Sequence, residues 1–171
     1  MRLARQLVKG PPPAVSEEHL VKCELATEVL HFSGRLRLQV TGSSMLPTVW
    51  PGDTLLIERS HCKAVKRGDI VLFGRDRRLC VHRVVRCSGG SPDGAILTRG
   101  DARRAADAPV AEGQLLGRVS LIVRDGKCIE PRRDLRLSER AVAAVVQSSE
   151  TAARIIVGMH GLLQRRPIQT A

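Results

Sequence analysis

The strongest constraint on the fold is a series of short segments with β-strand patterns between residues 35 and 130. The first, RLRLQVT at 35–41, alternates polar and apolar residues strictly, as a half-buried strand does. Asp125-Gly126 favours a tight hairpin between the last two segments. The other expected strands are 54–58, 69–73, 79–85, 95–99, 115–123 and 127–130. Because no alternation of strands with long helices occurs, we predict a mainly β (α+β) fold with antiparallel sheets or a partly closed β-barrel.

One helix is expected on each side of the β region. The first follows Ser16, a good N-cap, and ends near Gly34, a typical C-terminal stop. Its apolar residues recur at helical spacing: Val21, Leu25, Val29 and Phe32. The second begins at Ser138, and its apolar face is expected to hold Val142, Val145, Val146, Ala153, Ile156 and Leu163. We therefore expect a leader and helix at 1–34, a β domain at 35–130 and an amphipathic helical tail at 131–171.

The chain is strongly basic, with 28 Lys and Arg against 17 Asp and Glu and a net charge of +11. Such a charge favours nucleic acid, anionic membranes or acidic peptides as partners. The arginines are spread along the whole chain, however, which is typical of a solvated surface. The aromatic residues are Phe32, Trp50 and Phe73, too few for a platform that stacks bases. We do not expect a nucleic-acid partner.

Cysteine usage and hydropathy indicate the compartment. The five cysteines form no CxxC pair, which favours free thiols in a reducing environment. Cys80, His82 and Cys87 match no common zinc spacing, so we expect no metal. No window of 18 residues is both uncharged and apolar, and the N-terminus lacks the apolar core of a secretory signal. We expect a cytoplasmic protein, with peripheral membrane contact through the C-terminal helix as an open alternative.

Three segments carry candidate chemistry. They are GSSMLPT at 42–48, VHRVV at 81–85, and TRGD at 98–101, the last followed by Asp107. In this order, and with RGDIV at 67–71 between them, they resemble the signal peptidase I family. The resemblance covers about residues 34–120 and is closer to the endoplasmic-reticulum and archaeal branch than to the usual bacterial one. It implies the signal peptidase and LexA-like peptidase fold. Members usually carry N-terminal membrane spans, and none is expected before the serine.

A serine hydroxyl needs a neighbouring base to become a nucleophile. Most bacterial signal peptidases use a lysine, but this chain has no lysine between 66 and 127. His82 stands at that place, 38 residues after Ser44, and histidine can act as both base and acid. The resemblance implies Ser44 as nucleophile and His82 as base. It gives Asp107 as the acid that orients the base, with Asp101 in reserve.

The loop around the serine is expected to supply the oxyanion hole through the Ser44 backbone N–H. Some family members add a hydroxyl two residues earlier, where this chain has Gly42. Ser43 is expected to point away from the site. The remaining nucleophile-loop residues of the motif are Met45 and Pro47.

The leading hypothesis is a serine endopeptidase that cleaves through an acyl-enzyme. The resemblance implies an extended peptide or preprotein substrate, bound beside strand 35–41 and cut after small residues, without a cofactor. One alternative is a non-catalytic binding module on a peptidase fold. Another is a self-cleaving regulator of the LexA type, which usually needs an Ala-Gly or Cys-Gly site; this chain has neither dipeptide.

Overall fold

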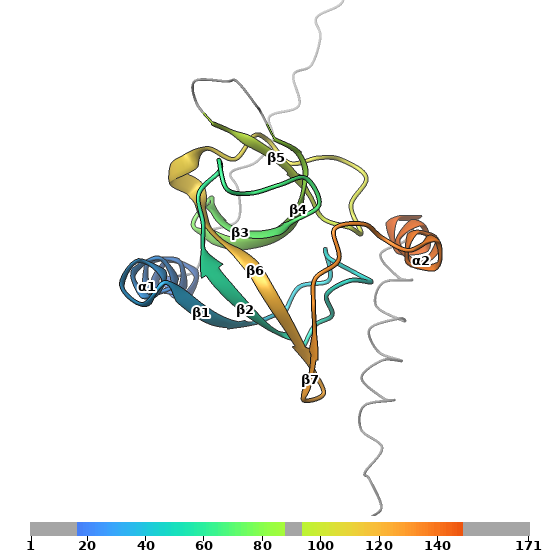
Figure 1. Cartoon of the computed structure of the whole chain (residues 1–171), viewed down its shortest axis with the longest axis horizontal. Coiled ribbons are helices and arrows are strands. Elements are labelled where there is room, and N and C mark those ends of the chain that lie inside the picture. The colour runs from blue at the N-terminus through green and yellow to red at the C-terminus, as the bar shows by residue number, and fades with distance from the viewer. Residues whose placement is uncertain (1–16, 88–93, 149–171) are drawn as a thin grey trace, which may run out of the picture.

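The computed structural model describes residues 17–87 and 94–148. Within them, seven strands form one antiparallel sheet that lies between two helices (Figure 1). The helices are α1 (Glu17–Ser33) and α2 (Leu137–Ser148), with a short 3-10 turn at Glu112–Gln114. The strands are β1 (Arg35–Gln39), β2 (Thr54–Arg59), β3 (Ile70–Arg75), β4 (Arg78–Cys87), β5 (Ile96–Arg99), β6 (Leu115–Arg124) and β7 (Lys127–Ile129).

The strands follow the spatial order β1-β2-β6-β3-β4-β5, and β7 pairs with β6. The long strand β6 is therefore central, because it pairs with β2 on one side and with β3 and β7 on the other. In the described part of the chain β1 and β5 end the sheet, which curves without closing into a complete barrel. The predicted mainly β fold with antiparallel pairing and two flanking helices is confirmed.

The core lies on both faces of β3. Neighbouring residues of a strand point to opposite faces, and Ile70 to Phe73 are all buried. Ile70 and Leu72 pack in one cluster with Leu30, Met45, Val49, Leu55, Ile57, Val119 and Ile122. Val71 and Phe73 pack in a second cluster with Cys62, Val65, Val84, Ile96, Val110 and Leu115. Strand β4 runs beside β3 and thereby lies between the two clusters.

Helix α1 ends as predicted but presents a different face. Gly34 has φ of 71° and its N–H donates to Leu30, as a glycine stop does. The buried residues of the helix are Ala26 and Leu30. The expected apolar face is wrong for Val21, Leu25 and Phe32, which are exposed, whereas Val29 is half-buried. Small Ala26 lies one turn from Leu30, so this pair forms the face that lies against the sheet.

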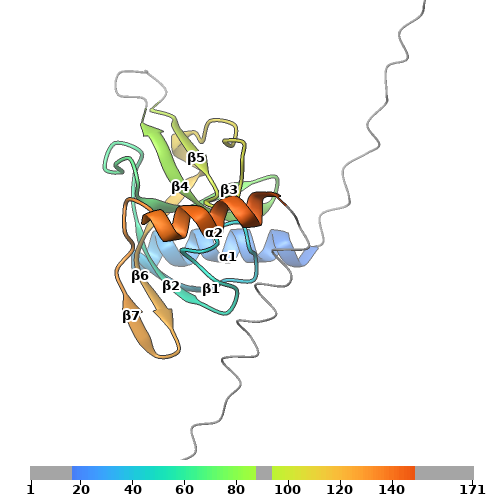
Figure 2. The ribbon, with the colours of Figure 1, turned by 90° about the vertical axis from the view of Figure 1, so that its right-hand side faces the viewer.

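Helix α2 begins at Leu137, where Glu139 accepts a hydrogen bond from the backbone N–H of Arg136. Ala143 and Val146 are buried and Val142 is half-buried, whereas Val145 is exposed, contrary to the prediction. Ala153, Ile156 and Leu163 lie outside the described residues, as do Ser16 and the leader. Figure 2 shows the two helices on opposite sides of the sheet.

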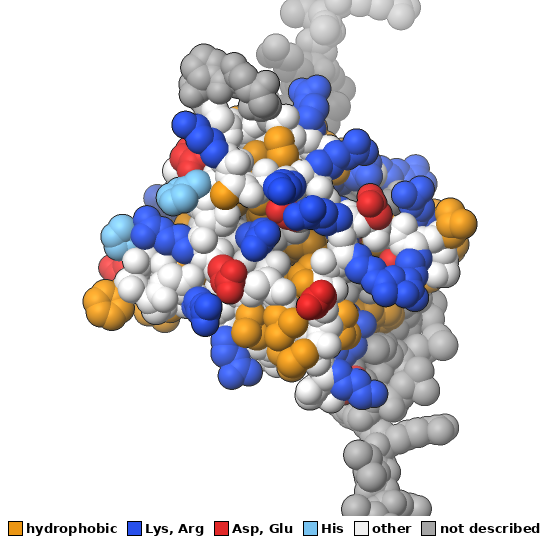
Figure 3. All heavy atoms as spheres, in the orientation of Figure 1, with side chains coloured by type: hydrophobic (Ala, Val, Ile, Leu, Met, Phe, Trp, Pro, Cys, Tyr) orange, Lys and Arg blue, Asp and Glu red, His pale blue; other side chains and the backbone are white. Residues whose placement is uncertain are grey.

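Basic side chains are spread over the face of the molecule that Figure 3 shows. Among the described residues no helix is long and apolar enough to span a membrane.

Candidate active site

Ser44 lies in the turn that follows β1. The strand ends at Gln39, but pairing continues to Val40, which exchanges backbone hydrogen bonds with Gly52 and Asp53. The chain then turns, with the N–H of Leu46 donating to the carbonyl of Ser43. Ser44 itself is half-buried. Its carbonyl accepts a hydrogen bond from the N–H of Ala102, which holds this turn against the segment after β5.

The other residues of the predicted nucleophile loop surround the serine. Gly42 and Ser43 are exposed, Met45 is buried in the first core cluster, and Pro47 is half-buried after a cis peptide bond. Met45 and Val49 therefore fix the turn in the core while Ser44 stays within reach of solvent. Gly42 offers no hydroxyl at the position where some family members carry one.

His82 lies on β4 and faces Ser44. Its Nε2 atom is 3.1 Å from Oγ of Ser44, and the imidazole is buried. The ring packs edge-to-face against Phe73, with centroids 5.9 Å apart. Gly100 permits this approach, because a Cβ there would lie 2.6 Å from the Ser44 carbonyl and 3.1 Å from Nε2. The close packing of three chain segments around the imidazole thus depends on a residue without a side chain.

Asp107 lies behind the imidazole. Its Oδ2 is 2.6 Å from Nδ1 of His82 and accepts a second hydrogen bond, of 2.7 Å, from the hydroxyl of Thr98. The N–H of Asp107 also donates to the carbonyl of Thr98, so β5 holds this acid twice. A carboxylate only accepts hydrogen bonds. Nδ1 therefore donates to this carboxylate, which leaves Nε2 of a neutral imidazole as the acceptor for the hydroxyl of Ser44.

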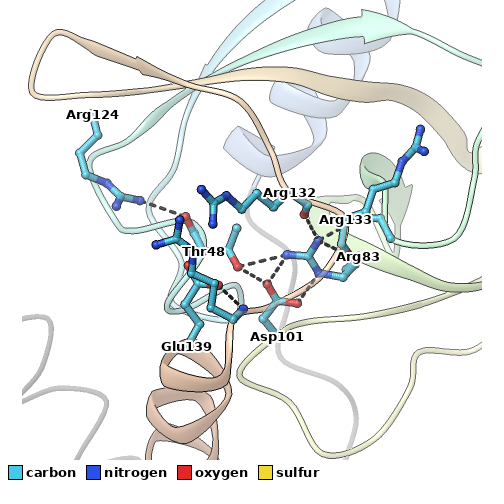
Figure 4. A network of polar contacts seen from close by, with 9 residues as sticks. Thr48, Arg83, Asp101, Arg124, Arg132, Arg133 and Glu139 are labelled. Atoms are coloured by element: carbon cyan, nitrogen blue, oxygen red, sulfur yellow. Dashed lines mark hydrogen bonds and ion pairs between the residues drawn. The ribbon is translucent and has the colours of Figure 1, made fainter.

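Asp101 makes different contacts. Its two oxygens accept hydrogen bonds of 2.8 Å each from Nε and Nη2 of Arg83, a bidentate pair that is almost wholly buried (Figure 4). The other guanidinium nitrogen of Arg83 donates to the carbonyls of Gly68, Arg132 and Arg133. Since Ser44 and Asp107 occupy the two ring nitrogens of His82, the geometry favours Asp107 over Asp101 as the orienting acid.

The candidate metal ligands do not converge. Cys87 directs its thiol to the carbonyl of Val65. In the described ranges, 17–87 and 94–148, no group of three His, Cys, Asp or Glu side chains could hold a metal ion. All five cysteines are free thiols.

Comparison with known proteins identifies relatives of this chain. The family model described as "Peptidase S24-like" matches residues 9–93, about half of the chain. The signal peptidase complex catalytic subunit SEC11 of Chaetomium globosum is 39% identical over 80 residues, which are 44% of this chain and 46% of that protein. The chain is a relative of the S24 and signal peptidases. This result confirms the relationship to peptidases that the three sequence segments predicted.

The family match covers only part of the candidate site. The S24-like match contains Ser44 and His82 but ends before Asp101 and Asp107. The choice between the two acids thus depends on the geometry described above. The chain also spans about half the length of the relative that it matches.

Several residues at the site carried no sequence-based role. Four residues of the three candidate segments had no predicted function: Thr48, Arg83, Thr98 and Gly100. One signal was available for Arg83, since an arginine inside an apolar strand needs a buried partner. No sequence pattern indicated that this partner is Asp101 or that Thr98 supports Asp107.

Proposed function

We propose that this chain is a serine endopeptidase in which Ser44 is the nucleophile, His82 the general base and Asp107 the orienting acid. One observation carries the proposal: Ser44, His82 and Asp107 form a continuous chain of hydrogen bonds from Oγ to carboxylate. They come from the turn after β1, from β4 and from the segment after β5. Only the fold brings them together, and the resulting order is that of a Ser-His-Asp triad.

The geometry supports the following acyl transfer. Nε2 of His82 takes the proton of Ser44 as Oγ attacks the peptide carbonyl carbon, and the carbonyl electrons move to its oxygen. The backbone N–H of Ser44 donates to this oxyanion. The imidazolium, stabilised by Asp107, then gives its proton to the leaving amine as the C–N bond breaks. His82 next deprotonates a water that attacks the ester, and the proton returns to Ser44 as the acid product leaves.

We further propose that the substrate is an extended peptide or preprotein segment bound along β1. This strand ends the sheet in the described part of the chain and leads directly into the Ser44 turn. An end strand can bind a peptide through main-chain hydrogen bonds while pockets select the side chains. By the resemblance, small residues precede the bond that is cut.

Peptide cleavage by the purified chain tests the function. Incubation with a diverse peptide mixture, followed by mass spectrometry of new termini, should give cleavages with wild type and none with Ser44→Ala. Ser43→Ala is the matched control, since this neighbouring serine is exposed and the two ring nitrogens of His82 contact Ser44 and Asp107. Cleavage by wild type and Ser44→Ala alike contradicts the assignment. A folded wild type that cleaves nothing favours a binding module.

A membrane contact through the C-terminal helix is also proposed, because α2 exposes Leu137 and Val145 beside basic Arg136 and Arg140. Cosedimentation with vesicles containing phosphatidylglycerol should fall for Leu137→Asp, with phosphatidylcholine vesicles as the control. Equal recovery of wild type and Leu137→Asp contradicts this contact.

A further inference from the structure

The turn that carries Ser44 is attached through one residue, Thr48, to two arginine–carboxylate pairs, of which one is buried and the other partly buried. We propose that Thr48 is a positioning residue, which holds the Ser44 hydroxyl at its reactive distance from His82. The inference rests on the proposed function, because it concerns the geometry of that nucleophile.

The side chain of Thr48 joins the first pair (Figure 4). Its hydroxyl donates to Oδ2 of Asp101 at 2.5 Å and accepts a hydrogen bond from Nη2 of Arg83 at 3.1 Å. A hydroxyl satisfies both partners at once, because it is donor and acceptor together. Arg83 follows His82 directly on β4. The contact thus ties the serine turn to the strand that holds the base.

The backbone of Thr48 joins the second pair. Its carbonyl accepts a hydrogen bond of 3.0 Å from Nη2 of Arg124, at the end of β6. Arg124 also binds Asp53 through two hydrogen bonds, of 2.8 and 2.7 Å. Asp53 is buried and accepts a hydrogen bond from the N–H of Trp50. This second pair fixes the far end of the turn to the central strand.

The short path from Thr48 to Ser44 transmits this restraint. The two residues are separated by Met45, Leu46 and Pro47, of which the first two are buried. The N–H of Val49 donates to the carbonyl of Met45, so the chain between them forms a closed turn. A rotation of Thr48 away from Asp101 would therefore move Ser44 relative to His82. Bidentate charged pairs suit this task because their geometry is planar and fixed.

The charge of the network also argues for positioning rather than chemistry. Asp101 and Arg83 neutralise each other, and the hydroxyl of Thr48 is directed to them and not to the imidazole. Thr48 is thus expected to change how often Ser44 is in place, without changing how a peptide or an inhibitor first binds.

The experiment compares Thr48→Val, which removes the hydroxyl but keeps the shape, with Thr48→Ser, which keeps the hydroxyl. Thr27→Val is the matched control, because the hydroxyl of Thr27 bonds only within α1, to the carbonyl of Cys23. The readout is covalent modification of Ser44 by a fluorophosphonate, resolved into a maximal rate and a half-saturating concentration. Amide hydrogen exchange at Val49 and Gly52 reports the turn without requiring activity.

We expect Thr48→Val to lower the maximal rate by about 10- to 100-fold, the scale of a misplacement of about 1 Å, with the half-saturating concentration unchanged. Exchange at the two amides should become faster. Thr48→Ser should restore most of the rate, and Thr27→Val should match wild type. A wild-type rate for Thr48→Val overturns the inference, and so does a Thr48→Ser that is as slow as Thr48→Val. Wild type that is not modified at Ser44 at all contradicts the proposed function instead.

Discussion

Two aspartates lie near His82, and their surroundings assign them different tasks. Asp107 contacts Nδ1 of the imidazole, whereas Asp101 neutralises buried Arg83. Asp107→Asn should leave stability nearly unchanged and lower kcat by about 10⁴-fold, because an amide can present a donor to Nδ1 and so favour the wrong tautomer.

Asp101→Asn should lower stability, and it should lower kcat less than Asp107→Asn does, because Asp101 contacts the hydroxyl of Thr48 rather than the imidazole. It leaves the guanidinium of Arg83 buried without its counterion, which is expected to lower the free energy of unfolding by about 3 kcal/mol or more. Urea unfolding and peptidase assays of both variants check this pair of expectations. A severe loss of kcat in folded Asp101→Asn, with Asp107→Asn near wild type, would show that the acids are exchanged.

The thiol of Cys62 gives a prediction that depends on pH. Burial first, and then the hydrogen bond and the charge of the neighbouring Glu112 carboxylate, together raise the pKa of this thiol to about 12. Only the thiolate is alkylated, so a raised pKa slows the reaction near pH 8. Mass spectrometry of iodoacetamide-treated native protein should find Cys62 modified far more slowly than exposed Cys128.

Glu112→Gln removes the negative charge and should therefore lower the pKa of Cys62 and speed its alkylation. Raising the pH toward 12 should speed the reaction of Cys62 in wild type. Equal rates for Cys62 and Cys128 near pH 8 would contradict the environment described for this thiol.

At the scale of elements, local patterns predicted the strands closely and the turns less well. Each predicted strand overlaps an observed one, because alternation and turn residues are local signals. The Asp125-Gly126 hairpin was predicted from its glycine, and both residues have positive φ. The hairpin between β3 and β4 was not predicted. Its turn consists of Asp76 and Arg77, with φ of 49° and 59°, and an arginine at the second position gives no sign of that conformation.

The turn at Asp76-Arg77 is therefore a site for stabilisation. Arg77→Gly should raise the free energy of unfolding by about 1 kcal/mol, because glycine adopts positive φ without the steric penalty of a Cβ. For a chain of this size we expect Tm to rise by about 2–4 °C in thermal unfolding. Arg78→Gly, one residue later on β4, is the control and should lower Tm. A lower Tm for Arg77→Gly would show that its exposed side chain matters more than its backbone.

The sequence pattern also predicted only in part which face of each helix is buried. Spacing alone does not tell which of two apolar stripes contacts the sheet. In α1 the buried stripe contains Ala26 and Leu30, while larger residues such as Phe32 face outward. The end of the helix is attached to the sheet at Gly34, whose carbonyl accepts a hydrogen bond from the N–H of Arg59 on β2.

At the scale of the whole molecule, the order of strands could not be predicted from local patterns. Strand β6 lies between β2 and β3, although about 60 and 45 residues separate it from them in the sequence. The hydrogen-bond partners of buried Arg83 could not be predicted from local patterns either, because they come from residues 48, 68, 101, 132 and 133. Motif order predicted which residues meet at Ser44, but not the network that holds them.

The contacts of Arg83 attach the segment after β7 to the β domain. The carbonyls of Arg132 and Arg133 accept hydrogen bonds from its guanidinium, and Arg133 also binds Asp69 at 2.9 Å. Gly68 has φ of 92°, and a Cβ there would lie 2.6 Å from Cβ of Arg133. Residues 132–133 are thus packed against the segment between β2 and β3.

Truncation tests this attachment. A chain ending after Glu130 should lose about 2 kcal/mol or more of unfolding free energy, since buried Arg83 loses two acceptors. A chain ending after Ser148, which keeps the segment and α2, is the reference against which this loss is measured. Equal midpoints for the two truncated chains in urea would contradict a structural role for residues 131–148.

The most direct test of the central claim is active-site labelling by a fluorophosphonate, followed by peptide mapping. The account predicts one phosphonylated residue, Ser44, in the wild-type chain, and a large loss of labelling in folded His82→Ala, because His82 is the base that contacts the Ser44 hydroxyl. His61→Ala, which changes an exposed histidine paired with Glu112, should label as wild type does. An unlabelled Ser44, or undiminished labelling of Ser44 in His82→Ala, would contradict the account.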